Sequence, residues 1–90
     1  MAAGGAYEQA QRAIENIAAV LQRAGARLSD VVRTRVYITG LAAVDDVSRA
    51  HREAFGAIGP ATALLVVAAL AAPGMLVEIE ADAVIGPEDY

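Results

Sequence analysis

Three carboxylates alternate with apolar residues in the segment 76–86, LVEIEADAVIG. Successive side chains of a β-strand point to opposite faces, so Glu78, Glu80 and Asp82 would share one face at spacings of roughly 6.6 Å. The apolar residues between them would share the opposite face and pack toward a core. The row of acids is therefore a solvated surface, a set of salt-bridge partners, or the acidic wall of a ligand site.

The other reactive side chains do not match a metal or nucleophile site. His51 is the single histidine, and it lies on the apolar stripe of a helix predicted over 43–55. The sequence has no second histidine, no cysteine and no carboxylate near His51 at the spacing of metal ligands. We therefore expect His51 to be a half-buried structural residue, and we predict no metal and no cofactor. The lack of cysteine excludes disulfides and thiol catalysis.

Charge is distributed unevenly along the chain. The net charge is −4, all seven basic residues are arginines, and none of them lies beyond Arg52. Five of the eleven acids fall within 78–89. Nucleic-acid binding requires a basic patch, so we expect no nucleic-acid partner.

The hydrophobic content is high for one small domain. Apolar residues make up 57% of the 90 residues, and the mean hydropathy is +0.43. A core of this size cannot hide so much apolar surface, which predicts self-association. The longest apolar run, 63–72, is far shorter than the roughly 18 residues that a membrane span needs. We therefore expect no membrane partner and a cytoplasmic protein.

Periodicity predicts five elements in the order α-β-α-β-β. Apolar residues at helical spacing indicate helices over 7–24 and 43–55, and shorter apolar runs indicate strands over 31–38, 61–70 and 76–85. Both helices should cover one face of the sheet. The strand over 61–70 is apolar on both sides, so we expect both of its sides to be buried.

The two faces of the predicted sheet differ in chemistry. Alternation along 31–38 directs four residues toward the helices: Val32, Thr34, Val36 and Ile38. The helix-free face should carry the three acids together with Val31, Arg33, Arg35, Tyr37, Leu64, Val66 and Ala68. This face is too apolar along 61–70 to be left bare to water, which again predicts that it is covered.

Four stretches, AIENIAAVLQRAGARLSDVVRTRVYITGL, AHREAFG, GPATALLVVAAL and LVEIEADAV, follow one another in the order and spacing of a known pattern. Over about residues 8–85 the chain resembles the RidA family, also called YjgF or L-PSP. The resemblance implies a chorismate-mutase-like α+β fold, with two helices packed on one face of a mixed β-sheet. It also implies trimers formed through the other face and ligand sites in clefts between subunits. The family's best-described activity is hydrolysis of reactive enamines and imines, and members have also been described as endoribonucleases or translation inhibitors.

The resemblance assigns roles to three residues. Glu78 matches the family's cleft carboxylate, which is thought to orient the hydrolytic water, so it is the candidate catalytic residue. Deaminating members grip the substrate carboxylate with an arginine, and this chain has Thr62 at that position. A hydroxyl can hydrogen-bond a carboxylate but cannot neutralise it, and losing a charge-assisted bidentate contact costs roughly 1.5–3 kcal/mol or more. Arg33 could reach across to bind substrate in its place, or it could be an ion-pair partner.

The resemblance also places 76–85 beside 31–38. The acids then share a face with Arg33 and Arg35, where cross-strand pairs of opposite charge are worth roughly 0.2–1 kcal/mol each. A ladder of ion pairs is therefore the simplest interpretation of Glu80 and Asp82.

Family members begin with additional strands that this sequence lacks, so one edge of 76–85 should be open. We accordingly predict a single RidA-like domain over 1–90, shortened at its N-terminus, that forms a homo-oligomer. The trimer of the family is one option and an edge-paired dimer is the other.

The sequence leaves open whether the chain is an enzyme. The first hypothesis is a hydrolase that deaminates, or a protein that binds, a small reactive imine or enamine in a cleft between subunits. The alternative is a non-catalytic module for small-ligand binding or assembly, which Thr62 and the missing strands favour. An endoribonuclease is the third hypothesis, and the acidic charge disfavours it.

Overall fold

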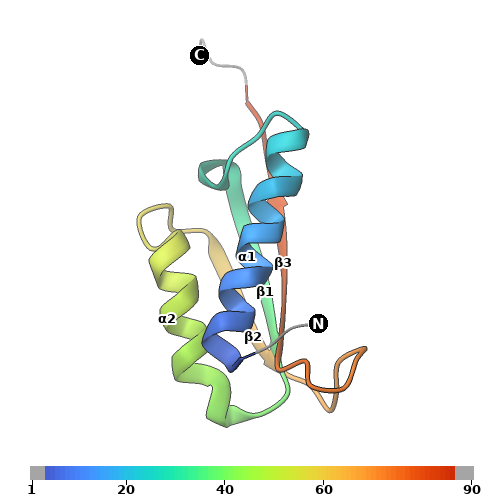
Figure 1. Cartoon of the computed structure of the whole chain (residues 1–90). Coiled ribbons are helices and arrows are strands. Elements are labelled where there is room, and N and C mark those ends of the chain that lie inside the picture. Colours follow the sequence, from blue (N-terminus) through green and yellow to red (C-terminus); the bar gives the residue numbers. More distant parts are fainter. Residues whose placement is uncertain (1–3, 87–90) are drawn as a thin grey trace.

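Two α-helices lie against one face of a three-stranded sheet in the computed structural model, which describes residues 4–86 (Figure 1). The helices and strands follow the predicted order, with two short 3-10 helices, η1 and η2, added in the connections. Their bounds are α1 Ala6–Arg23, η1 Leu28–Asp30, β1 Val31–Ile38, η2 Leu41–Ala43, α2 Val44–Phe55, β2 Ala61–Val66 and β3 Val77–Ala83. The predicted domain over 1–90 includes two ends, 1–3 and 87–90, that lie outside the described residues.

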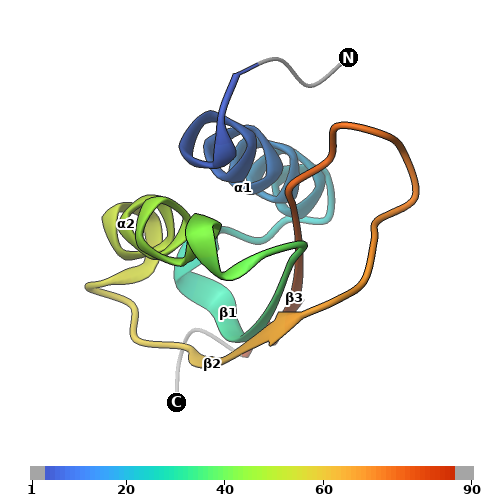
Figure 2. The same cartoon turned by 90° about the horizontal axis from the view of Figure 1, so that it is seen from below.

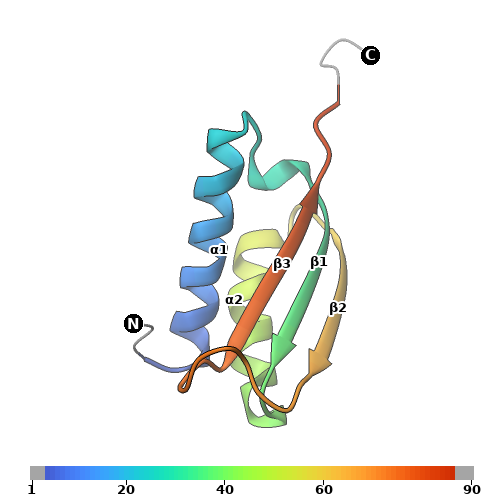
Figure 3. The same cartoon turned by 90° about the vertical axis from the view of Figure 1, so that its right-hand side faces the viewer.

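The central strand of the sheet is β1, in the order β2-β1-β3. It pairs in parallel with β2, with Thr34 opposite Thr62, and antiparallel with β3, with Tyr37 opposite Glu78. Helix α2 connects the two parallel strands, and Figure 3 shows both helices on the same side of the sheet. The expected mixed sheet with two helices on one face is therefore present.

The core lies between the helices and this face of the sheet (Figure 2). Its largest fully buried side chains are Phe55, Ile38, Val36, Val47 and Thr34. The apolar stripe of α1, which includes Ala10 and Ile14, packs against Val77 and Ile79 of β3. Neither helix in residues 4–86 is both long and apolar enough to cross a bilayer.

The beginning of β1 departs from the predicted alternation. Val31 is buried, whereas Val32 was expected to face the helices and is 50% exposed. The pairing with β3 shifts its register between Val31 and Arg33, which is the signature of a β-bulge. The extra residue reverses the sidedness at this point, and strict alternation holds again from Thr34 onward.

Strand β2 differs more from expectation. It ends at Val66 instead of residue 70, and it lies at an edge of the sheet with every residue exposed. Leu64 and Val66 pair with core-facing residues of β1, so they lie on the helix side and not on the helix-free face as predicted. Leu65 is the large apolar residue that faces the helix-free side. The expectation that both sides of 61–70 are buried is therefore wrong for the isolated chain, because α2 does not extend over this edge.

The sheet also has an open edge at β3. Within the described residues β1 is the strand that pairs with β3, and no strand covers its other side. Both edges of the sheet thus present unpaired backbone groups or exposed apolar side chains. Edges of this kind tend to pair with a strand of another chain.

Candidate functional site

The acidic row on β3 divides into two parts. The Arg35 guanidinium contacts Glu80, with Nε 3.0 Å from Oε1, and also Asp82, with Nη1 3.5 Å from Oδ2. The Tyr37 hydroxyl donates a second hydrogen bond to Glu80, at 2.8 Å. Glu80 and Asp82 are therefore ion-pair partners on the helix-free face, as the sequence predicted.

These contacts shift the pKa values of the groups involved. The hydrogen bond from Arg35 lowers the pKa of Glu80, and the hydrogen bond from Tyr37 adds to the effect. In return, Glu80 raises the pKa of Tyr37 and, together with Asp82, that of Arg35. All four side chains lie at the surface, where water screens such pairs, so they contribute little to stability.

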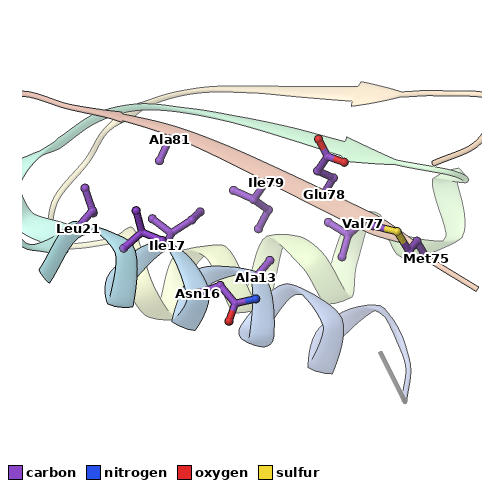
Figure 4. Close-up of a pocket in the computed structure, with 10 residues that line it drawn as sticks. Ala13, Asn16, Ile17, Leu21, Met75, Val77, Glu78, Ile79 and Ala81 are labelled. Atoms are coloured by element: carbon purple, nitrogen blue, oxygen red, sulfur yellow. The ribbon is translucent and has the colours of Figure 1, made fainter. Parts of the chain in front are cut away.

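Glu78 stands apart from this network. It lies on the same face, opposite Tyr37, yet its carboxylate forms no hydrogen bond or ion pair within the described part of the chain. In Figure 4 the carboxylate points to the side of β3 opposite α1. It is thus the one acid of the row that is free to meet a ligand or a neighbouring subunit.

An apolar groove of about 370 Å³ runs between α1 and the open edge of β3. In Figure 4 its side chains converge from the helix and from the core-facing side of the strand. The lining residues are Ala13, Asn16, Ile17, Val20, Leu21, Met75, Val77, Glu78, Ile79 and Ala81. The Glu78 carboxylate points away from this groove, so the groove does not place a substrate against it.

Thr62 is the second residue of the exposed edge strand β2. Its Oγ1 lies 2.8 Å from Thr34 Oγ1 and 3.3 Å from the carbonyl oxygen of Pro60. Arg33 projects from the helix-free face of β1, and together with Thr62 it borders a groove of about 280 Å³ at the beginning of β2. It makes no ion pair with another described residue, because its cross-strand neighbour Asp82 contacts Arg35 instead. Arg33 is therefore not the ladder partner that the sequence suggested, and its charge faces solvent.

One chain does not bring Glu78 and Thr62 together. They lie on strands that flank β1 from opposite sides, and their partners on β1 are Tyr37 and Thr34. Two strand spacings and three residue steps separate their backbones by about 14 Å. Glu78 also faces the helix-free side, whereas the Thr62 hydroxyl faces buried Thr34. A single substrate can meet both side chains only if they come from different copies of the chain.

His51 is half-buried on the helix side of the sheet, away from the acids, as predicted. Its ring packs on Phe55 with centroids 4.8 Å apart, and burial lowers its pKa. Sequence reasoning missed its polar contact, in which Nε2 lies 2.8 Å from Thr34 Oγ1. One indication of this contact was present in the sequence: Thr34 stands among apolar residues that face the core, and a fully buried hydroxyl requires a hydrogen-bond partner.

Gln9 was also missed. It is buried on α1, where its Nε2 donates to the Gly74 carbonyl oxygen at 3.0 Å and its Oε1 accepts from the Leu76 amide at 2.8 Å. Both partners precede β3, so Gln9 holds the backbone two residues before Glu78. The helical pattern did not predict this role for Gln9, because Gln9 lies at the border of the apolar stripe of α1. Across residues 4–86 no group of three or more His, Asp or Glu side chains is arranged to hold a metal ion.

The family model for endoribonuclease L-PSP matches residues 1–85. The chain belongs to this family, also called RidA or YjgF. Among curated relatives, a RutC family protein of Pyrococcus abyssi is 40% identical over 87% of this chain and 61% of its own length. A human protein named 2-iminobutanoate/2-iminopropanoate deaminase is 34% identical over 97% of this chain and 63% of its own length. The chain thus spans less than two thirds of these RidA-family relatives.

Solved structures agree with the fold. A member of the YjgF/YER057c/UK114 family from Mycobacterium tuberculosis superimposes with a TM-score of 0.91 at 45% identity. The alignment covers 93% of this chain and 71% of that protein. The predicted family and the predicted α+β fold are therefore both confirmed.

Proposed function

We propose that this RidA-family chain forms a homo-oligomer that hydrolyses small 2-imino acids in a cleft between subunits. The observation that carries the proposal is the unpaired Glu78 carboxylate, exposed on the helix-free face beside two acids that are both held by Arg35. The names of the deaminase relatives supply the substrate class. A cytoplasmic location belongs to the same proposal and can be checked by cell fractionation.

The proposed reaction is the addition of water to a carbon–nitrogen double bond. Glu78 accepts a proton from water as the oxygen bonds to the imine carbon, and the imine nitrogen takes up a proton from solvent, which gives a carbinolamine. Glu78 then returns its proton to the nitrogen, the carbon–nitrogen bond breaks to release ammonia, and the hydroxyl loses its proton to solvent as the carbonyl of the 2-oxo acid forms. For 2-iminobutanoate the products are 2-oxobutanoate and ammonia, so one water is consumed for each imine. Positioned general bases contribute roughly 10²–10⁴-fold to such steps.

Thr62 and Arg33 are the proposed substrate-binding residues. Both border the groove at the beginning of β2, where the Thr62 hydroxyl can donate to a carboxylate and the Arg33 guanidinium can supply positive charge. They do not form a rigid bidentate fork, so the substrate should be held less firmly than by a single arginine at position 62. We therefore propose a slow enzyme with a weak anchor.

The separation of Glu78 from Thr62 supports a site that is shared between subunits. The exposed apolar residues of β2, among them Leu65 at 41% and Val66 at 54%, support burial of this strand against another copy. Hiding about 100 Å² of apolar surface contributes roughly 2.5 kcal/mol. The homotrimer of the family is the proposed assembly, and a dimer paired through the open β3 edge is the alternative.

A coupled assay tests the activity. A pyridoxal-phosphate-dependent dehydratase generates 2-iminobutanoate in the cuvette, and semicarbazide traps whatever imine escapes hydrolysis. The chain should lower the trapped fraction, Glu78→Gln should reduce this effect at least about 100-fold, and the matched control Glu80→Gln should retain most of it. Thr62→Arg should increase the rate. Full activity of Glu78→Gln would contradict the catalytic role.

Thr62 also favours a second candidate, a binding module without catalysis, because the position lacks a charged anchor. This candidate predicts that the chain binds 2-oxobutanoate but leaves the trapped fraction unchanged in the same assay. An endoribonuclease activity, which the family name suggests, predicts tight binding of single-stranded RNA at physiological salt. We expect that binding to be weak because the net charge is −4.

A further inference from the structure

Three polar side chains form a continuous hydrogen-bonded chain from α2 to the exposed edge of the sheet. His51 Nε2 lies 2.8 Å from Thr34 Oγ1, which lies 2.8 Å from Thr62 Oγ1. Thr34 is 0% exposed, so water cannot reach it to satisfy its hydroxyl. The hydrogen bonds of Thr34 are therefore confined to His51 and Thr62, which couples these two residues.

Each hydroxyl carries a single hydrogen, so the chain can run in two directions. In one direction His51 Nε2–H donates to Thr34, Thr34 donates to Thr62, and Thr62 is left to donate outward. In the absence of ligand that last hydrogen can go to the Pro60 carbonyl oxygen, at 3.3 Å. In the other direction Thr62 donates to Thr34 and Thr34 donates to an unprotonated Nε2. Thr62 then offers only lone pairs to a ligand, and a carboxylate would be repelled.

We propose that His51 is a positioning residue for anion recognition: a proton on Nε2 directs the hydrogen bonds through Thr34 so that the Thr62 hydroxyl donates to a bound carboxylate. This rests on the proposed binding of the substrate carboxylate at Thr62. The protonated imidazolium permits only this direction, because both of its nitrogens are donors. The neutral ring permits it only in the tautomer with the hydrogen on Nε2.

The surroundings of His51 allow the effect to be observed. The groove between α2 and β2 has a volume of about 250 Å³ and is lined by Val36, Val47, Ser48, His51, Arg52, Thr62 and Leu64. Arg52 is the one charged side chain among these described residues, and the strand residues that face His51 across the groove, Thr34 included, are uncharged. Burial lowers the pKa of His51, so the ring is mostly neutral at physiological pH and its tautomer matters.

Nitrogen-15 NMR tests the proposal directly, because His51 is the single histidine of the sequence and the signals of its two ring nitrogens report the tautomer. The full chain is titrated with 2-oxobutanoate, the expected product, from pH 5.5 to pH 8. Above the pKa of His51, the ring in the complex should carry its hydrogen on Nε2. Thr62→Val should weaken binding at least tenfold. Affinity should rise severalfold toward low pH, and by reciprocity the ligand should raise the pKa of His51.

Thr34→Val is the decisive variant because it is similar in shape and removes the hydroxyl that links His51 to Thr62. Coulomb attraction between an imidazolium and the anion persists in this variant, so the difference from wild type isolates the hydrogen-bonded chain. The ligand should no longer affect the tautomer in Thr34→Val, and the affinity should depend less on pH. Thr34→Ser, which keeps the hydroxyl, should restore both effects.

Three results would overturn the proposal: an unprotonated Nε2 in the complex, identical pH profiles for wild type and Thr34→Val, or no binding of 2-oxobutanoate at millimolar concentration. The deaminase assay separates these from a failure of the proposed function. Coupling of His51 to the ligand without imine hydrolysis refutes only the catalytic activity. Hydrolysis together with an uncoupled His51 refutes only the positioning role.

Discussion

Replacing Gln9 with methionine should destabilise the protein far more than its place on a helix suggests. The substitution keeps the length and the apolar packing of the side chain but removes both polar atoms. Two backbone groups before β3 then lose their partners, the Gly74 carbonyl oxygen at 3.0 Å and the Leu76 amide at 2.8 Å. Both contacts are partly shielded from water, so solvent replaces them poorly.

The magnitude follows from these two hydrogen bonds. Each contributes roughly 0.5–1.5 kcal/mol net, and an amide left without a partner away from water costs about 1–3 kcal/mol. We expect a loss of about 2–3 kcal/mol in the free energy of unfolding, against a total of roughly 5–15 kcal/mol for a domain. With a urea m-value of about 1 kcal/mol/M, the midpoint should fall by about 2–3 M.

Urea unfolding followed by circular dichroism, at equal chain concentrations, measures this loss. The matched control is Gln11→Met, two positions along α1, where the exposed Gln11 Nε2 lies 3.0 Å from the Tyr7 hydroxyl. Surface substitutions of this kind change stability by less than about 0.5 kcal/mol. Equal midpoints for the two variants would refute the view that Gln9 anchors the beginning of β3.

Three further predictions concern charge and assembly. Arg35 lowers the pKa of Glu80, so their pair stabilises the fold above the ordinary carboxyl pKa of 4.5, and this stabilisation is lost as the pH falls below it. Arg35→Met should raise the pKa of Glu80 in an NMR titration and should remove this loss of stability at acidic pH. Burial lowers the pKa of His51 below 6.5, so as the pH falls the unfolded chain takes up the proton before the folded chain does. The free energy of unfolding should therefore decline below about pH 6.5, and His51→Gln should reduce this decline in urea titrations. Leu65→Glu should lower the oligomer mass in light scattering, whereas Leu41→Glu, at a position that is 75% exposed, should not; an unchanged mass for Leu65→Glu would exclude β2 from the interface.

Local patterns predicted the elements well where one face is buried and the other is wet. Alternation gave the bounds of β1 at 31 and 38, and helical spacing gave α2 to within one residue of its observed start. The family pattern also distinguished Glu78 from the two acids beside it, and the structure finds both of those acids paired with Arg35. These features depend on residues that are close together in the sequence, so a short stretch of sequence is enough to predict them.

The failures have a different origin. The bulge that buries Val31 and exposes Val32 depends on pairing with β3, which lies some fifty positions away in the sequence and is not visible in a local pattern. The apolar character of 61–70 was interpreted as burial within the chain, whereas Leu64 and Val66 are exposed at an edge. Their composition is consistent with contacts to another copy of the chain. The alternation of apolar residues along one chain cannot distinguish burial inside that chain from burial against another copy.

The polar contacts of the site were the least predictable part. Thr34 and His51 are 17 positions apart, and Gln9 and Leu76 are 67 apart. Each pair meets because the fold brings a helix against the sheet. Buried polar atoms must find partners, but the sequence does not say which ones they find.

Subunit complementation tests whether Glu78 and Thr62 of one site lie on different subunits of the oligomer. Glu78→Gln and Thr62→Val proteins are each assayed for imine hydrolysis alone, and then after unfolding together and refolding as mixed oligomers. We expect each variant alone to have little activity and the mixed oligomers to recover a substantial part of the wild-type rate, since some clefts receive an intact Glu78 and an intact Thr62. Activity that stays at the average of the two separate variants would contradict a site shared between subunits.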